Sequence, residues 1–130
     1  MAIRYFRLRL STTLATAIDE ALRHTGYGPR QKGVWVGEAL EQLKREDPTL
    51  HKVGAGDDLD APRDRSLLLS FARDHFRLLE DLVLQFREAA PLVEGVRALI
   101  VRSAIRSRIR SSKNSPGSYP RYPQHNYKGD

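Results

Sequence analysis

The chain has 130 residues, with 22 basic against 16 acidic side chains, a net charge of +6 and no cysteine. This length suits one compact domain with a tail and leaves little room for a second core. The lack of cysteine excludes a disulfide framework and thiolate chemistry, and the four histidines are too scattered to indicate metal ligands. We therefore expect a cytoplasmic protein with no metal and no cofactor.

The positive charge is concentrated towards the C-terminal end. From Arg97 onward there are eight basic residues and one acidic residue, whereas the preceding part holds 14 basic and 15 acidic residues. A basic end on a nearly neutral body is common in proteins that bind phosphate, although solubility alone can also produce it. The aliphatic run at residues 98–101 is far too short to cross a bilayer, and the N-terminus has no signal-peptide pattern, so we expect no membrane association.

Residues 4–10 alternate polar and apolar side chains, which predicts a strand with one face in the core and the other facing outward. The apolar set is Phe6, Leu8 and Leu10, and the outward set is Tyr5, Arg7 and Arg9. A strand of this length is not stable alone and must pair with another. We expect a two-stranded ribbon with outward arginines, a shape that fits the major groove of DNA.

Two helices are expected after this strand. Ser11 or Thr12 can cap the first helix, and Gly26 suits its left-handed C-terminal position. Pro29 lies where a second helix would begin, with apolar residues at roughly helical spacing after it. Trp35 is expected at the edge of that apolar stripe.

The same pattern returns 61 residues later. Residues 65–71 align with residues 4–10, and residues 78–83 align with residues 17–22 as two apolar positions, two acids and two apolar positions. A fixed offset of this kind indicates two copies of one unit. The alternative is chance similarity, since amphipathic helices resemble one another by default.

In the second copy, one helix is expected to end near residues 89–90, and Pro91 is expected to open another. The side chains expected to point inward from that last helix are Val93, Val96, Leu99, Ile100 and Ile105. Three arginines of the same helix recur every fourth residue and would line one side of it, either as a solvated face or as backbone phosphate contacts. These are Arg102, Arg106 and Arg110.

These patterns divide the chain into a first repeat at residues 1–46, a linker at 47–64, a second repeat at 65–110 and a flexible basic tail at 111–130. The linker is rich in glycine, proline and aspartate, and it is long enough for the second strand to fold back beside the first. A loose spacer between independently folding units is the alternative.

Little in the sequence supports catalysis. The paired acids at residues 19–20 and 80–81 fall on repeated helix positions and are expected to be solvated surface. The glycine pairs at residues 26–28 and 54–56 lack the Gly-Lys-Ser/Thr ending of a phosphate-binding loop. We do not expect an enzyme.

The strand, helix and second helix between Tyr5 and Leu43 resemble the ribbon-helix-helix family of DNA-binding proteins, and the repeat extends the resemblance to about residues 3–110. The resemblance implies a mainly α fold with a short two-stranded antiparallel β-ribbon, built from two units in tandem. It also implies that alternate strand residues read bases and that the start of the second helix grips phosphate. The base-reading set would be Tyr5, Arg7 and Arg9, and the phosphate-binding set Gln31 and Lys32.

The two copies differ on the outward strand face, because the second copy offers Ser66, Leu68 and Ser70. A ribbon formed within one chain would read DNA mainly through its first strand and suit a non-palindromic site, as a monomer with an internal pseudo-dimer. Pairing between two chains, giving a homodimer, is the alternative. The second strand departs from the polar face usual in the family, which puts its base reading in doubt.

The tandem layout is similar to accessory factors of plasmid transfer, which bind near an origin of transfer and help to assemble the relaxase complex. The wider family more often contains transcriptional repressors, including autoregulating antitoxins. We therefore expect double-stranded DNA as a partner, with a relaxase or another protein as a possible second one. The alternative from a different class is an interaction scaffold or antitoxin-like protein that binds a protein partner through its helices and tail.

Overall fold

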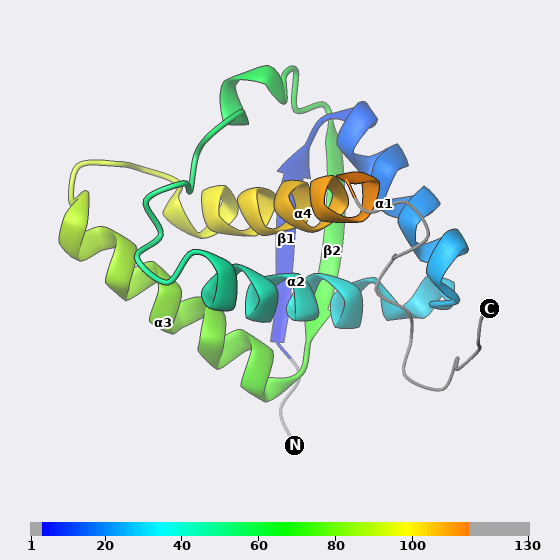
Figure 1. Ribbon diagram of the computed structural model, residues 1–130, viewed down its shortest axis with the longest axis horizontal. Coiled ribbons are helices and arrows are strands. Elements are labelled where there is room, and N and C mark those ends of the chain that lie inside the picture. Colours follow the sequence, from blue (N-terminus) through cyan, green and yellow to red (C-terminus); the bar gives the residue numbers. More distant parts are fainter. Residues whose placement is uncertain (1–3, 115–130) are drawn as a thin grey trace.

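The computed structural model describes residues 4–114 and is mainly helical, with one two-stranded antiparallel sheet (Figure 1). The predicted basic tail lies outside the described residues, except for its first four positions. The elements in chain order are β1 (Arg4–Leu10), α1 (Thr12–Thr25), α2 (Lys32–Glu46), β2 (Arg65–Phe71), α3 (Arg73–Ala89) and α4 (Val96–Asn114). Single turns of 3-10 helix lie at Pro29–Gln31 and Asp57–Leu59.

The two strands pair with each other along their whole length and form the β1–β2 ribbon. Arg4 is the partner of Phe71 and Leu10 is the partner of Arg65. The two strands have the same order of exposed and buried positions. The inward side chains in the C-terminal half of each strand are fully buried, namely Leu8, Leu10, Leu69 and Phe71. The predicted division of residues 4–10 into an inner and an outer face is confirmed.

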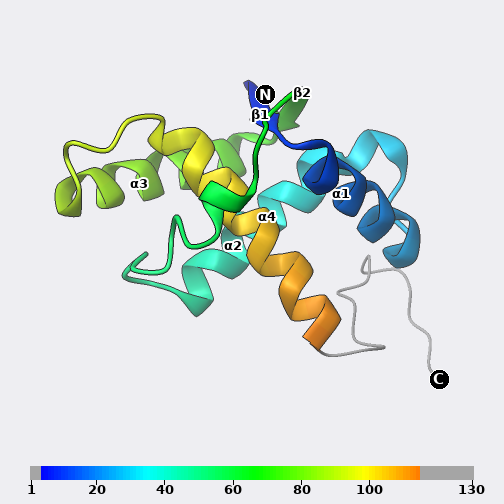
Figure 2. The same cartoon turned by 90° about the horizontal axis from the view of Figure 1, so that it is seen from above.

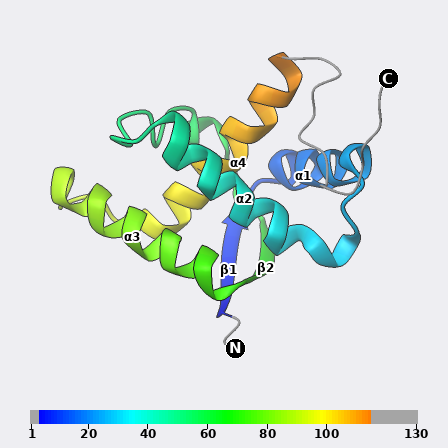
Figure 3. The same cartoon turned by 60° about the horizontal axis from the view of Figure 1, so that its bottom comes forward.

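The boundaries of α1 are those expected from its end signals. The hydroxyl of Ser11 accepts a hydrogen bond from the amide of Leu14 at 3.1 Å. Gly26 adopts the left-handed conformation with φ of 85°, which ends the helix. Figures 1 and 3 show α1 and α3 on opposite sides of the β1–β2 ribbon, so the first helix of each repeat flanks one edge.

The helices α2 and α4 pack against each other and against the inner face of the ribbon. Figure 2 shows both with their N-terminal ends nearer the ribbon and their C-terminal ends farther from it. Trp35 is 1 % exposed, so its expected position at the edge of the stripe is wrong. The guanidinium of Arg108 on α4 lies 4.7 Å from the Trp35 ring and covers it. A helix covered by two neighbours buries more than one stripe of side chains.

The close packing of α2 on β2 depends on a residue without a side chain. A Cβ atom at Gly33 would lie 1.9 Å from the carbonyl oxygen of Ser70. Only glycine fits this approach of helix to strand backbone.

The second repeat departs from expectation at the start of its last helix. Pro91 opens a turn, and α4 begins five residues later at Val96. Ala90, the residue before the proline, leaves the helical conformation with φ of −140° and ψ of 68°, and Gly95 reverses the chain with φ of 65°. Val93 is therefore exposed, whereas Val96, Ile100 and Ile105 are buried as predicted and Leu99 is half-buried.

The helix α4 also continues four residues beyond the predicted end of the repeat at residue 110. Inside this extension the hydroxyl of Ser112 donates to the carbonyl of Arg108 at 3.1 Å. A serine within a helix can satisfy its hydroxyl in this way on the carbonyl of the preceding turn.

One ion pair joins α1 to α2, and another joins α3 to α4. Lys32 of α2 contacts Asp19 of α1 at 3.2 Å, and Arg97 of α4 contacts Glu80 of α3 at 2.7 Å. Asp19 and Glu80 are 61 residues apart, the offset of the repeat. Two pairs of acids were expected to be solvated surface. In each pair, the first acid instead forms an ion pair with the next helix.

The linker packs against the rest of the molecule. Leu50 and Asp60 are buried, and the amide of Gly54 donates to the hydroxyl of Ser103 on α4 at 3.0 Å. Within residues 4–114, no helix is long and apolar enough to span a membrane.

Candidate functional site

The outer face of the β1–β2 ribbon is the surface that no other described element covers. Figure 2 shows the ribbon at one side of the molecule, with α2 and α4 beneath it. Three side chains from each strand occupy this face in cross-strand pairs. These pairs are Tyr5 with Ser70, Arg7 with Leu68, and Arg9 with Ser66.

The two sides of this face are chemically unequal. Arg7 and Leu68 are cross-strand partners at the middle of the register, so the local pseudo-twofold axis of the antiparallel ribbon passes between them. The first strand contributes a tyrosine and two arginines, whereas the second contributes two serines and a leucine. Tyr5 is 67 % exposed and Leu68 is 54 % exposed. The centre of the face is therefore a cation beside an apolar side chain.

Arg7 and Arg9 are held to different degrees. The Nε and Nη2 atoms of Arg9 donate to the carbonyl oxygen of Arg63 at 3.2 and 2.6 Å. This contact uses the edge of the guanidinium formed by Nε and Nη2. The edge formed by Nη1 and the second N–H of Nη2 is directed away from that carbonyl. Arg7 has a single long contact, from Nη1 to the Ser66 hydroxyl at 3.4 Å. Arg9 is positioned before any ligand arrives, while Arg7 is freer to adjust.

A cluster of charges in the linker and α4 fixes the end of β1 that carries Arg9. We call it the Asp57 cluster: Asp57, Arg63, Arg102 and Arg106. The carboxylate of Asp57 accepts hydrogen bonds from all three guanidinium groups, at 2.7 to 2.9 Å for the shortest contact of each. The Nη1 atom of Arg102 also donates to the carbonyl of Arg9 at 3.2 Å.

The Asp57 carboxylate is ionised in this setting. Burial alone would raise its pKa, but the hydrogen bonds and charges of Arg102 and Arg106 outweigh burial and lower the pKa below its ordinary value of 3.8. The cluster then connects to both parts of Arg9, through Arg63 to its side chain and through Arg102 to its backbone.

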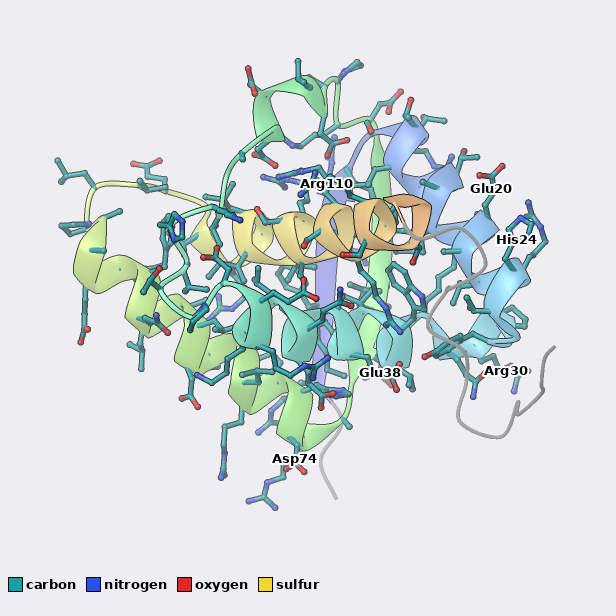
Figure 4. The ribbon with its side chains drawn as sticks, in the orientation of Figure 1. Glu20, His24, Arg30, Glu38, Asp74 and Arg110 are labelled. Atoms are coloured by element: carbon teal, nitrogen blue, oxygen red, sulfur yellow. The ribbon has the colours of Figure 1, made fainter. Side chains whose placement is uncertain are left out.

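The three arginines of α4 do not form one free stripe. Arg102 and Arg106 have side chains only 9 % and 13 % exposed, and both pair with Asp57. Arg110 is exposed and extends from α4 towards the linker (Figure 4). The expected common side of α4 is therefore present, but a solvated face is wrong for Arg102 and Arg106, because four-residue spacing does not show that an acid of the linker covers them.

Gln31 and Lys32 do lie at the start of α2, as expected. The Gln31 side chain accepts a hydrogen bond from the amide of Gly28 at 2.6 Å, and Lys32 pairs with Asp19. Figure 2 places this helix start on the ribbon side of the molecule, and the start of α4 likewise. The N-terminal ends of two helices therefore flank the ribbon with the partial positive charge of their dipoles.

Two other features lie away from the ribbon face. A cavity of about 490 Å³ lies between α1, the linker and α4, with Leu14, Leu59 and Ile109 among its lining residues. Tyr27 donates a short hydrogen bond to Glu38 beside Arg108, and burial together with this bond raises the pKa of Tyr27 to about 12. In residues 4–114 no group of three or more histidine or acidic side chains could hold a metal ion.

No protein-family model, no curated protein and no solved structure matches this chain.

Sequence reasoning missed the Asp57 cluster and the role of Arg63. The acidic run at residues 57–60 was visible, but its partners are 45 and 49 residues away on α4. One available signal was the return of arginine every fourth residue on a helix with a buried side, since an arginine that is buried needs an anion as its partner.

Proposed function

We propose that this protein binds double-stranded DNA by inserting the β1–β2 ribbon into the major groove, as a tandem ribbon-helix-helix protein. The observation that carries the proposal is the uncovered outer face of the ribbon, with Arg7 and Arg9 projecting from one strand. A two-stranded ribbon has the width that the major groove admits.

Arg7 and Arg9 supply the chemistry for base reading. Each guanidinium can donate two parallel hydrogen bonds to the O6 and N7 atoms of guanine, which contributes about 1–3 kcal/mol of discrimination per base. Arg9 contacts the carbonyl of Arg63 through its Nε–Nη2 edge, which leaves the Nη1–Nη2 edge of its guanidinium for the bonds to guanine. Tyr5 lies on the same face and can contact a base or a phosphate.

The starts of α2 and α4 are placed to contact the DNA backbone on either side of the groove. Backbone amides at a helix start attract phosphate, and Lys32 with Gln31 lies at the start of α2. Such contacts position the protein without reading sequence. Arg102 and Arg106 have no part in this proposal because both are mostly buried and are held by Asp57.

The difference between the strands favours a non-palindromic target bound by one chain. Since β1 pairs with β2 of the same chain, the ribbon does not need a second copy. We propose a cytoplasmic role as a plasmid-transfer accessory factor, which would also contact a relaxase, or as a transcriptional repressor. Both roles use the same DNA-binding surface.

The first test is the solution mass of the protein, free and with random duplex DNA, measured by light scattering at low and moderate salt. We expect one chain mass for the free protein and a complex that weakens as salt rises, with a slope of about −0.9 in log K against log salt for each phosphate contacted. The absence of any complex at low salt would contradict the proposal and favour a protein-binding scaffold.

The second test removes the two arginines together. Arg7→Ala/Arg9→Ala is expected to weaken binding to a specific duplex by about 100-fold or more, since two guanine contacts of 1–3 kcal/mol each are lost. The control is Arg23→Ala/Arg45→Ala, which removes the same charge from exposed positions in the last turns of α1 and α2. Equal losses in both variants would contradict base reading by the ribbon.

A further inference from the structure

We infer that Leu68 recognises the 5-methyl group of a thymine at the centre of the DNA site. The inference rests on the proposed DNA binding and adds a specificity that the two arginines do not supply. It assigns base recognition to the second strand, β2, as well as to β1.

Leu68 has no role in the core. Its neighbours in β2, Leu67 and Leu69, are half-buried and fully buried on the inner face, where they complete the packing beneath the ribbon. Leu68 projects from the opposite face and is 54 % exposed, between Ser66 and Ser70. An exposed leucine in the middle of an otherwise polar strand face is a candidate contact for an apolar group on a partner.

The chemistry of the major groove limits what that apolar group can be. Thymine presents a methyl group there beside its O4 acceptor, whereas guanine, adenine and cytosine present hydrogen-bond donors and acceptors without a methyl group. A leucine side chain cannot bond to those polar edges and would remove them from water without replacement. Leu68 therefore favours thymine both by contact with its methyl group and by excluding the alternatives.

The position of Leu68 in the ribbon predicts where in the DNA site this thymine lies. Leu68 is the cross-strand partner of Arg7, and paired side chains of a ribbon have Cβ atoms about 5 Å apart. The pseudo-twofold axis between them would exchange the two DNA strands. Arg7 and Leu68 are thus placed over adjacent central base pairs, with guanine on one DNA strand and thymine on the other.

The flanking residues of the second strand do not compete with this specificity. Ser66 and Ser70 carry hydroxyls that can donate to or accept from any base edge. Discrimination within the second half of the site is therefore concentrated at Leu68.

The test uses deoxyuridine, which differs from thymidine by the methyl group alone. Each thymine of a duplex selected by the wild-type protein is replaced singly, and affinity is measured by titration of the full chain. We expect one central position at which the replacement weakens wild-type binding about fourfold, the effect of about 0.8 kcal/mol for one buried methyl group. In Leu68→Ala the same replacement should have no effect.

The matched control is Leu84→Ala, which removes the same atoms from a 64 % exposed leucine of α3 and should keep the full sensitivity to the methyl group. Cytosine at the sensitive position should bind weakly and 5-methylcytosine should recover part of the affinity. The inference is overturned if the selected duplex is bound tightly and no thymine methyl affects the wild type, or if Leu68→Ala retains the sensitivity. Failure of the wild type to select any duplex would instead overturn the proposed function itself.

Discussion

The two strands of the ribbon have the same backbone pattern and the same inner face, yet their outer faces differ in chemistry. Leu8 and Leu69 are equivalent and both fully buried, whereas Arg9 and Ser70 are equivalent and have different charge. A shared core restricts what inner positions can hold, and the uncovered outer positions are free of that restriction. The two strands therefore differ at the outer positions, which are the positions that would contact a partner.

The two strands also differ in how the helices hold them. The carbonyl of Ser70 lies directly against Gly33 of α2, while the equivalent carbonyl of Arg9 accepts a hydrogen bond from Arg102 of α4. Close backbone packing holds the second strand, and a charge cluster holds the first. The strand with the arginines is the one fixed by the linker.

The largest expected effect comes from breaking the support of the first strand. Asp57→Asn leaves two mostly buried guanidinium groups, those of Arg102 and Arg106, without their anion. Breaking a buried ion pair by removing one partner commonly costs about 3–5 kcal/mol. We expect a loss of about 3 kcal/mol in the free energy of unfolding, measured by urea denaturation. Asp58→Asn, at the exposed neighbouring position, should change it by less than about 0.5 kcal/mol.

The pH dependence of stability gives the same cluster a second readout. Because the pKa of Asp57 is lower in the folded than in the unfolded protein, its contribution is present above about pH 4 and is lost as the pH falls through the folded value. Asp57→Asn should remove this part of the acid sensitivity. If the free energy of unfolding of the variant falls at low pH as steeply as that of the wild type, Asp57 is not ionised within the cluster.

A smaller effect is expected from breaking the support of the second strand. Gly33→Ala places a methyl group against the backbone of Ser70, where no side chain can move aside. Overpacking of this kind costs about 1–3 kcal/mol. Gly28→Ala is the control, because its added Cβ would meet a side-chain oxygen of Gln31 at 3.4 Å. Equal thermal stability of the two variants would show that α2 does not approach β2 this closely.

The smallest effect concerns the outer faces themselves. The variant Ser66→Tyr/Leu68→Arg/Ser70→Arg gives the second strand the chemistry of the first. It should bind a palindrome, built by inverting the half-site of the first strand, about tenfold more tightly than the wild type does, since guanine contacts are gained. Replacing the same three residues by alanine should give no such gain. Filter binding at fixed salt compares the three proteins.

Much of the local structure could be predicted from the residues. Period-two alternation defines both faces of residues 4–10, and Ser11 with Gly26 marks the ends of α1, because these signals act within a few residues. The 61-residue offset also led to the partner strand. The outward set of Tyr5, Arg7 and Arg9 follows from the same alternation.

The remaining features depend on contacts distant in sequence. The spacing of Arg102 and Arg106 shows a shared side but not the acid at residue 57 that occupies it. Pro91 is as compatible with a turn as with a helix start, and the choice depends on where α4 can pack. Trp35 is buried because α4 brings Arg108 over it, which no pattern within α2 reveals.

The most direct test of the account is the selection of binding sites by the wild-type chain from a pool of random duplexes. We predict a non-palindromic site whose guanine-containing half disappears when Arg7→Ala/Arg9→Ala is used in the same selection. A palindromic site would contradict the unequal strands as the reading surface. No enrichment of any sequence at low salt would contradict DNA recognition by this ribbon.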